Sequence, residues 1–544
     1  MFQENYEEFT ESQRKILNRY VTNSSKNVFV LRNLPEVIKG ALFSRYSRSS
    51  LGLRSLLLKE FVSGEESAFT DIVSESENSE EQTLAIQRAQ NFYDRILDGY
   101  GDDSIGELGG AHLAIENISM IAAKVIEDSR IGGSPLEKST RYIYFDQKVQ
   151  GEYLFYREPV LMTSAYRDTY IETCNQLFDT YSELIPPLTE MIEEKMPQEP
   201  GTSQVAYKAS LRAKVLDCLR GLLPAGTLTN MGIYGNGRFY DSLIHKLRCN
   251  NLAELQQIGD DIYEELSKVI PSFVRRANAD HHTHKNYADF TQTMRMDRAV
   301  MAAQHTVFPE RDMEKGVQLI HHDSDCVTKV AAALLYENSN KSLNDLYTYC
   351  EQLPEEEISL ILDAACSARE NRRHKSPRAL EHATFTFELL SDFGIYRDLH
   401  RHRILTQERQ LLSCDYDYYI PEEILGTELE TKYRHAMDQA KQAYDVISVE
   451  LPEEAQYIVP MAYNIRWYFH VNLRALQWMC ELRSAPAGHP NYRYVAQRMA
   501  REVSNAYPQF ERFFKFVDYE GYSLGRIGQE QRKAEKQEQL NSPF

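Results

Sequence analysis

Most of the chain consists of stretches in which apolar residues recur every three to four positions, the spacing of an amphipathic helix. Polar or glycine-rich breaks separate these stretches, as at residues 99–104, 280–285 and 371–376. Helices are expected over residues 1–60, 83–98, 107–127, 160–275 (with breaks at Pro186-Pro187 and Pro200-Gly201), 327–366, 381–403 and from 421 to about 517.

Alternating or tyrosine-rich segments predict a small number of strands among these helices. The segments are residues 142–145, 153–156 and 415–420. Short strands between long helices indicate an α/β (α+β) fold.

Several short motifs occur twice at nearly the same interval, which is the signature of an internal duplication. The pairs are Pro224 and Pro460 (236 positions apart), Asn236-Gly237-Arg238 and Asn472-Leu473-Arg474 (236 apart), and Leu247-Arg248 and Leu482-Arg483 (235 apart). Glu107 and Glu381 lie 274 positions apart, so the first copy has about 38 additional residues. The sequence therefore predicts two tandem copies of one domain, each a small sheet with long helices, that form a pseudo-dimer. The expected bounds are 1–290 (with the insertion at about 145–215), 291–528 and a charged tail at 529–544.

The charge balance argues against polyanionic partners. A net charge of -19 disfavours general binding to nucleic acid or to an anionic membrane. No apolar run approaches the roughly 20 residues that span a bilayer, and the acidic N-terminus lacks the apolar core of a signal peptide. The 8 cysteines form no C-x-x-C pair, which is typical of reduced, buried thiols in a cytoplasmic protein.

Arg401-His402-Arg403 is the segment with the clearest chemical meaning. Two planar guanidinium groups on either side of an imidazole suit a phosphate or another planar anion. A basic last turn that complements the helix dipole is the alternative interpretation of the same three residues. In the first copy, Glu137-x-Ser139-x-Arg141-Tyr142 is a second polar motif, and Arg220 stands four residues before Pro224.

Taken together, these motifs resemble the flavin-dependent thymidylate synthase family. The resemblance rests on Ser376-Pro377, Glu381-His382, Thr386-Phe387, Arg401-His402-Arg403-Ile404, Pro460, Asn472-Leu473-Arg474 and Leu482-Arg483. It covers most of 327–520 and, more faintly, 40–270. It implies methylation of dUMP to dTMP with FAD, NADPH and methylenetetrahydrofolate, and a homodimer of this chain equivalent to the family's tetramer.

Neither copy contains the whole family pattern. The second keeps Arg-His-Arg but has 409–413 in place of Glu-x-Ser-x-Arg, and Gln456 in place of the arginine before Pro460. The first keeps Glu137-x-Ser139-x-Arg141 and Arg220 but has only Asp128-Ser129-Arg130 in place of Arg-His-Arg. Because family members bind dUMP across a subunit boundary, the resemblance implies one complete site made from the two copies, and a reciprocal site that is lost.

The resemblance also implies a role for each residue of that site. Arg483 would be catalytic, holding the pyrimidine ring as negative charge develops on it. The dUMP residues would be Arg401, Asp398, Glu137, Ser139, Arg141 and Arg220. The FAD residues would be Ser376, Arg401, His402, Arg403, Asn472, Arg474 and Trp478. Asp398 departs from the glutamine that is usual in the family and could alter the choice of pyrimidine.

The remaining candidates favour ordinary structural roles. The histidines at 281, 282 and 284 are expected in a solvated loop rather than at a metal, and no metal site is expected. The aromatic cluster Trp467-Tyr468-Phe469 and Trp478 is expected in the core, and Trp478 could alternatively edge the flavin. Two other functions remain open: a non-catalytic flavin- or nucleotide-binding protein, and a flavin-dependent methyltransferase acting on another pyrimidine.

Overall fold

The computed structural model describes residues 8–46, 49–62, 106–129, 131–308 and 315–541. The helix expected at 83–98 and the turn at 99–104 lie outside these residues, as does Arg130. The chain forms two compact units. The first comprises Met1–Glu116, Ser129–Glu137 and Met231–Phe308, and the second Asn117–Asp128, Lys138–Asn230 and Pro309–Phe544.

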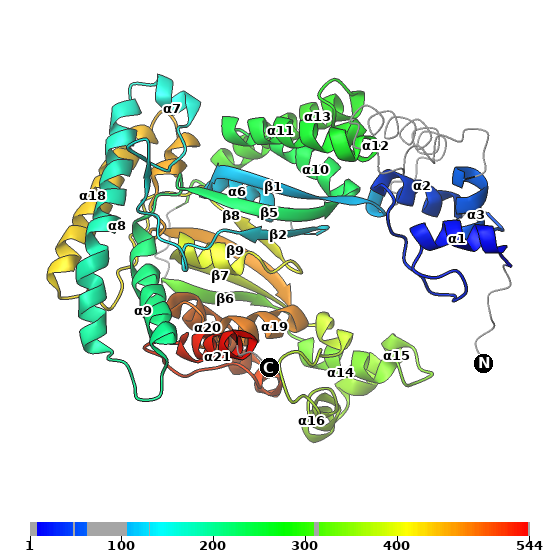
Figure 1. The fold of residues 1–544 in the computed structure, drawn as a ribbon. Coiled ribbons are helices and arrows are strands. Elements are labelled where there is room, and N and C mark those ends of the chain that lie inside the picture. The colour runs from blue at the N-terminus through cyan, green and yellow to red at the C-terminus, as the bar shows by residue number, and fades with distance from the viewer. Residues whose placement is uncertain (1–7, 47–48, 63–105, 130, 309–314, 542–544) are drawn as a thin grey trace. The chain divides into compact units, whose positions relative to one another are not determined.

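The first unit is built mainly of helices, with a sheet of order β1-β5-β2. The strands are β1 (Gly110–Ser119), β2 (Gly133–Glu137) and β5 (Leu228–Asn236). Helices α10 (Gly237–Arg248) and α11 (Ala253–Val269) lie along one face of this sheet (Figure 1). The other elements are α1 (Glu11–Tyr20), α2 (Glu36–Tyr46), α3 (Leu53–Leu56), η1 (Leu57–Val62), α12 (Pro271–Val274), η4 (Arg275–Ala277) and α13 (His282–His305).

The second unit contains an antiparallel sheet of order β6-β7-β9-β8. The strands are β6 (Gly316–His322), β7 (Thr384–Asp392), β8 (Thr406–Arg409) and β9 (Asn464–Asn472). Inward-facing Phe387 and Phe469 pair across β7 and β9 and are fully buried. Trp467 is also buried, whereas Tyr468 and Trp478 are exposed, so the expected core position is confirmed for two of the four aromatics and wrong for the other two. Helices α19 (Leu473–Arg483) and α20 (Pro490–Ala506) lie beneath this sheet in Figure 1.

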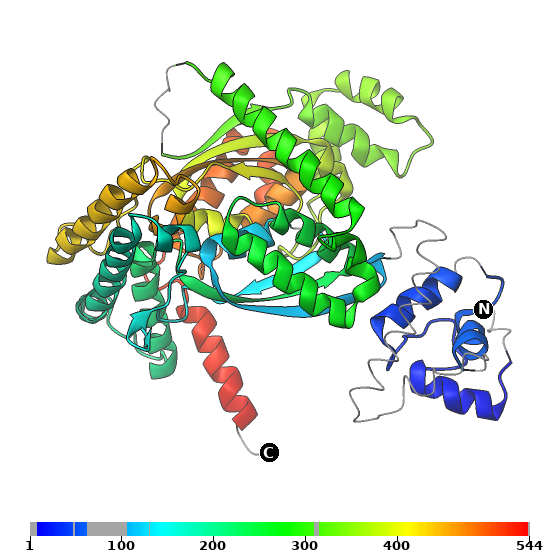
Figure 2. The same ribbon diagram turned by 90° about the horizontal axis from the view of Figure 1, so that it is seen from above.

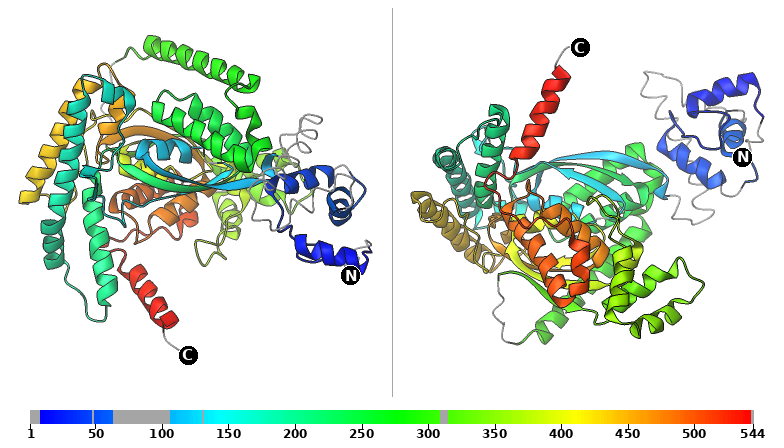
Figure 3. Two further views of the ribbon diagram at one scale, coloured as in Figure 1. Left: turned by 45° about the horizontal axis from the view of Figure 1, so that its top comes forward. Right: turned by 90° about the horizontal axis from the view of Figure 1, so that it is seen from below.

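Helices surround this sheet within the second unit. The long helices α8 (Arg167–Lys195), α9 (Gln204–Leu219) and α18 (Glu428–Ile447) run side by side (Figures 1 and 3). A separate group consists of α14 (Cys326–Tyr336), α15 (Leu343–Glu351) and α16 (Glu355–Ala364). Helix α21 (Ile527–Asn541) packs on α9 and then extends away from it (Figure 2). The shorter elements are α6 (Met120–Glu127), β3 (Lys148–Val149), β4 (Glu152–Tyr153), α7 (Pro159–Thr163), η3 (Arg220–Leu222), η5 (Arg378–His382), α17 (Phe393–Leu399), η6 (Glu454–Ile458) and η7 (Pro508–Phe514).

The two halves of the chain have the same order of elements. The series β1-α6-β2 … β5-α10-α11 corresponds to β7-α17-β8 … β9-α19-α20, and the sheet orders β1-β5-β2 and β7-β9-β8 match. The first residues of β5 and β9, Leu228 and Asn464, stand at the same 236-position interval as the repeated motifs. Tandem α/β copies are therefore the architecture of this chain.

Equivalent residues of the two copies meet each other inside the second unit. Pro224 forms a backbone bridge with Pro460. Ala225 N donates to Val459 O at 2.8 Å, and Met461 N donates to Leu223 O at 2.9 Å. Contacts of a segment with its own equivalent are the mark of a two-fold axis, so the copies pack as a pseudo-dimer at this point.

Four stretches predicted to be helical are wrong in part, because 107–127, 160–275, 381–403 and 421–517 contain β1, β5, β7 and β9 respectively. Residues 384–392, placed in the helix that was to end at Arg403, form strand β7, and only Phe393–Leu399 is helical. Phe385, Phe387 and Leu389 are buried while Thr384, Thr386 and Glu388 are less so, which is the period of a strand. Residues 107–127 likewise divide into β1 and α6.

Other local predictions also fail. Residues 142–145 form no strand, and the tyrosine-rich segment 415–420 contributes only the bridge Tyr418–Tyr463. The stretch 160–275 contains β5, and α8 continues through Pro186 and Pro187. Leu184 and Leu188 on either side of the prolines are fully buried, so packing maintains the helix despite the lost backbone hydrogen bonds.

Candidate functional site

The corner between β7 and α17 positions the arginine-rich segment. Asp392 caps α17 by accepting a hydrogen bond from Ile395 N at 2.9 Å. The helix ends at Leu399, so Arg401, His402 and Arg403 lie in the turn that follows it. Arg401 and Arg403 are exposed, whereas His402 is half-buried.

Asp398 and Arg220 form an ion pair between the two copies. Arg220 follows α9 and is buried, and its Nη1 donates to Asp398 Oδ2 at 3.1 Å. Its Nη2 has no hydrogen-bond partner among the described residues. A Cβ on Gly394 would lie 3.0 Å from this nitrogen, so the absence of a side chain there makes room for the guanidinium.

Arg141 is held in a fixed orientation nearby. Its Nε and Nη2 donate to the two carboxylate oxygens of Asp217 at 2.6 and 2.7 Å, and its Nη1 donates to the Tyr492 hydroxyl at 3.0 Å. Asp217 stands on α9 just before Arg220. Burial alone would lower the pKa of Arg141, but Asp217 outweighs this and raises it, so the guanidinium remains charged.

Arg483 approaches the same tyrosine from the second copy. It is the last residue of α19, and its guanidinium carbon lies 5.7 Å from the centre of the Tyr492 ring, against 5.5 Å for that of Arg141. Arg483 Nε donates to His402 Nε2 at 3.0 Å. Burial, followed by the charge of Arg483, holds the pKa of His402 well below its usual value, so His402 is neutral and accepts through Nε2.

Four arginines therefore surround Asp398: Arg141, Arg220, Arg401 and Arg483. Burial alone would raise the pKa of Asp398, but the charges of Arg220, Arg141, Arg483 and Arg401 lower it well below its usual range. We call these arginines, with Asp217 and Asp398, the arginine cluster. The four arginines outnumber the two carboxylates of this cluster, so it has an excess of positive charge that an anionic ligand such as a phosphate would complement.

A buried acid that sequence reasoning missed lies behind Arg401. The Glu127 side chain pairs with Lys124, and its Oε2 lies 3.0 Å from His400 Nε2. Its Oε1 lies 3.7 Å from Arg401 Nη2. Burial alone would raise the pKa of Glu127, but Lys124, His400 and Arg401 lower it, so the carboxylate is ionised. Glu127 directly precedes the remnant Asp128-Ser129-Arg130, and no motif marked it.

The expected flavin residues occupy the start of α19 and the turn before η5. Asn472 caps α19, accepting from Ala475 N at 2.9 Å. Arg474 Nε donates to Ser376 O at 2.9 Å and its Nη1 to Glu381 Oε1 at 2.6 Å, while the buried Ser376 hydroxyl donates to Gln477. Trp478, one turn further along α19, is 42% exposed and presents a flat ring to solvent.

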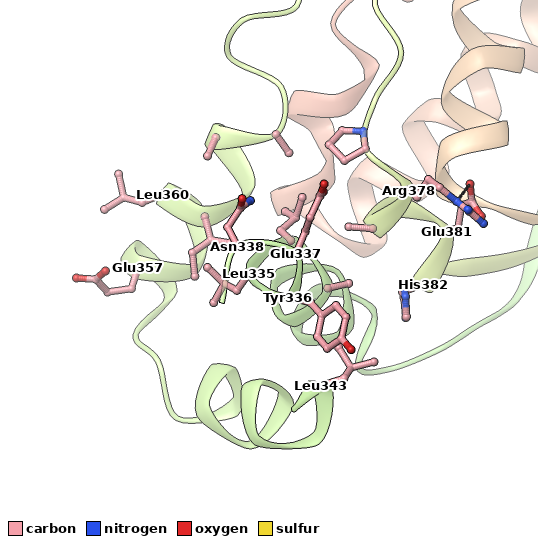
Figure 4. A pocket seen from close by; sticks show the side chains of 17 residues that line it. Leu335, Tyr336, Glu337, Asn338, Leu343, Glu357, Leu360, Arg378, Glu381 and His382 are labelled. Atoms are coloured by element: carbon pink, nitrogen blue, oxygen red, sulfur yellow. Dashed lines mark ion pairs between the residues drawn. The ribbon is translucent and has the colours of Figure 1, made fainter. Parts of the chain in front are cut away.

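A cavity of about 1050 Å³ adjoins this group. Figure 4 shows Arg378, Glu381 and His382 on one side of it and Glu357 and Leu360 of α16 on the other. Glu381 belongs both to the cavity wall and to the ion pair with Arg474. Glu381 is therefore the residue that connects the cavity wall with the Ser376–Arg474 group.

Two other predicted residues make contacts within their own units. Ser139 Oγ accepts from Arg141 N at 3.2 Å and so shapes the turn that carries Arg141. Glu137 is buried at the end of β2, opposite Met231 in the first unit.

Residues of the reciprocal site satisfy one another. Gln456 Oε1 accepts from Arg409 Nη1 at 3.3 Å and from Leu412 N at 3.2 Å. Asp128 Oδ1 accepts from Gln407 Nε2 at 3.0 Å. The polar groups of these residues thus bind other protein groups, whereas the arginine cluster carries an excess of positive charge.

Several general expectations concern the whole chain. All 8 cysteines are free and seven are buried. Among the described residues, no group of three or more potential ligand side chains could hold a metal. The expected loop at 281–284 is wrong: His281 caps α13, and the buried His284 stacks on His245. In the described ranges, no helix is both long and apolar enough to cross a bilayer.

Comparison with known proteins adds the family context. A model described as thymidylate synthase complementing protein matches twice, at residues 61–272 and 318–509. A UPF0159 protein of Chlamydia muridarum is 56% identical over 97% of this chain and 98% of its own length. A UPF0159 protein of Thermoplasma acidophilum is 34% identical over 91% and 98% of the two chains. A flavin-dependent thymidylate synthase of Thermotoga neapolitana is 26% identical over 28% of this chain and 76% of its own.

Proposed function

Because the chain belongs to the thymidylate synthase complementing protein family, we propose that it methylates dUMP to dTMP in a flavin-dependent reaction. In this proposal methylenetetrahydrofolate supplies the carbon and NADPH reduces the flavin. One composite site per chain, made from both copies, carries the reaction.

The convergence of Arg141 and Arg220 from the first copy with Arg401 and Arg483 from the second is the observation that carries this proposal. The arginines of the first copy lie 181 to 342 positions in sequence from those of the second, yet all four act on Asp398, and Arg141 and Arg483 share Tyr492. An excess of positive charge suits a phosphate dianion, which arginine binds well because its donors form a planar fork.

Each side chain then has a chemical task. Arg220, whose Nη2 is buried without a hydrogen-bond partner among the described residues, holds the phosphate together with Arg141. Arg483 stabilises negative charge on the pyrimidine ring, because a preorganised cation acts most where charge develops. Neutral His402 accepts from Arg483 Nε and so fixes the plane of that guanidinium.

The residues expected to bind FAD fit such a cofactor. Arg474 is about one-third exposed, Trp478 offers an accessible ring, and the cavity beside Glu381 provides volume. Ser376, Asn472, Arg474 and Trp478, with Arg401, His402 and Arg403, would hold it. A bound flavin would supply hydride to the methylene carbon transferred to the pyrimidine.

The experiment measures turnover by the purified full-length protein. An absorbance band near 450 nm reports bound flavin, and the conversion of dUMP to dTMP reports the reaction. Arg483→Ala and Arg141→Ala should each lower turnover by at least about 100-fold, as loss of one transition-state donor does. Arg498→Ala, an exposed arginine of α20, is the matched control and should retain activity.

Two results would contradict the proposal. Colourless protein that binds dUMP without converting it, even after addition of FAD, would show a nucleotide-binding protein instead. Methyl transfer to dCMP but not to dUMP would assign a different pyrimidine.

A further inference from the structure

Residues after 509 lie beyond both family matches, yet they reach the arginine cluster. Residues 518–526, here called the C-terminal strap, have no regular secondary structure and lead into α21. The strap crosses the N-terminal part of α20 and ends beside Arg141.

Both ends of the strap are anchored within the second unit. Arg493 Nη2 donates to Glu520 O at 2.9 Å, and Gln497 Nε2 donates to Asp518 O at 2.8 Å. A Cβ on Gly525 would lie 2.1 Å from Pro486 O, so only glycine permits this approach. Helix α21 then packs on α9, where Ser203 N donates to Gln531 Oε1 at 3.0 Å.

The last residue of the strap, Arg526, is 5% exposed and holds the Arg141 turn. Its Nη1 donates to Arg141 O at 3.2 Å, and its guanidinium carbon lies 4.3 Å from the centre of the Tyr142 ring. Its Nη2 is 3.9 Å from Asp217 Oδ1, and its buried Nε has no hydrogen-bond partner among the described residues.

None of these contacts gives Arg526 an anion of its own. Asp217 is already bidentate to Arg141, so Arg526 adds a further positive charge to the cluster. Burying a cation without a dedicated anion is costly, and an apolar side chain of similar volume is often equal or better for the fold. A retained buried cation beside a phosphate-binding arginine points to a ligand.

We propose that Arg526 is a positioning residue of the nucleotide site: it fixes the Arg141–Tyr142 turn, and its charge strengthens the site's hold on the phosphate. This inference rests on the proposed function. It makes the C-terminal strap part of the site, although the family model ends before it.

The test compares Arg526→Met, Arg526→Lys and the matched control Arg532→Met, which changes an exposed arginine of α21. Full-length proteins are titrated calorimetrically with dUMP and with inorganic phosphate. Arg526→Met should raise the dUMP dissociation constant about tenfold with an unchanged or higher melting temperature. Arg526→Lys should recover part of the affinity, and Arg532→Met should match the parent protein.

Amide hydrogen exchange of residues 139–145 gives a readout that needs no ligand. Exchange should increase in Arg526→Met and not in Arg532→Met, because only the former loses the hydrogen bond to Arg141 O. Unchanged affinity together with unchanged exchange would overturn the proposal, as would a lower melting temperature with unchanged affinity. If the parent protein binds phosphate but not dUMP, the proposed function fails while the phosphate and exchange data still decide the role of Arg526.

Discussion

Asp398 shows how one residue sets the charge of the arginine cluster. Its carboxylate pairs with Arg220, a cation that a phosphate would otherwise contact. Because Arg220, Arg141, Arg483 and Arg401 outweigh the effect of burial and lower its pKa, Asp398 is ionised and repels an incoming anion. In the proposed site, a carboxylate at this position would therefore weaken the binding of a nucleotide phosphate.

We predict that Asp398→Gln tightens dUMP binding by about tenfold, or roughly 1.4 kcal/mol, because one negative charge leaves the site. Titration calorimetry at two salt concentrations measures this, and the gain should shrink at high salt. Asp289→Gln, an exposed acid on α13, is the control. Weaker binding by Asp398→Gln would instead give the carboxylate a direct role in holding the pyrimidine.

His489 makes the stability of the fold depend on pH. Its Nε2 donates to Asp217 O at 3.1 Å and its Nδ1 accepts from Asn491 N at 3.2 Å, so the ring is neutral. Burial, followed by the charge of Arg220, lowers its pKa to about 3. Since the unfolded chain takes up this proton near pH 6.5, the contribution of His489 to stability is complete above that pH and is lost as the pH falls toward 3.

We therefore predict that His489 accounts for about 2 kcal/mol of the stability lost between pH 7 and pH 5. His489→Gln should show a flatter pH profile over this interval, measured by denaturant unfolding at several pH values. Asp217 and Asp398 also have lowered pKa values but titrate at lower pH. Equal slopes for the parent and His489→Gln would refute the assignment.

At the scale of elements, α19 joins the two parts of the site. It begins at the Asn472 cap, carries Arg474 and Trp478 on its way, and ends at Arg483 beside Tyr492. Its buried Glu481 receives two hydrogen bonds from Arg369, at 3.0 and 2.8 Å. This pair attaches the turn before Ser376 to the helix.

We predict that Glu481→Gln lowers the free energy of unfolding by about 3 kcal/mol, because the Arg369 guanidinium then stays buried without its anion. The turn that carries Ser376 should loosen, so the ratio of flavin to protein absorbance should also fall. Glu511→Gln, an exposed acid in η7, should change neither quantity. Normal flavin content in a destabilised Glu481→Gln protein would show that the Arg369–Glu481 pair does not contribute to flavin binding.

At the scale of the whole molecule, duplication explains why each copy lacks part of the pattern. The copies meet across Pro224 and Pro460, so residues of either copy can complete one site while the reciprocal residues are free to change. Gln456, Arg409 and Gln407 now satisfy protein groups instead. The homodimer implied by the family resemblance remains a separate prediction, which light scattering would test.

We predict one dUMP and one flavin per chain. Calorimetric titration and flavin quantification against protein concentration measure both ratios. Binding of two nucleotides per chain would show that the reciprocal site still binds dUMP, although arginines equivalent to Arg141 and Arg220 are absent from it.

The sequence alone determined the family, the duplication and the identity of the paired motifs, because these depend on residue types at fixed intervals. Arg220 before Pro224 and Arg483 after Asn472 could be picked out because the family resemblance gives these positions a role. The secondary structure was harder to predict from the sequence. Thr384–Asp392 is a short apolar run that fits both a strand and a helix, and only its pairing with β9 makes it a strand.

Tertiary structure alone decided which charges meet. Asp217 binds Arg141 across 76 positions, Glu127 lies beside His400, and Arg526 contacts Arg141 across 385 positions, and no local pattern marks these partners. The free energy of a buried ion depends on the few ångströms around it, and packing of distant segments sets that distance. Motif spacing can therefore predict the members of such a site, whereas their partners and protonation states follow from the fold.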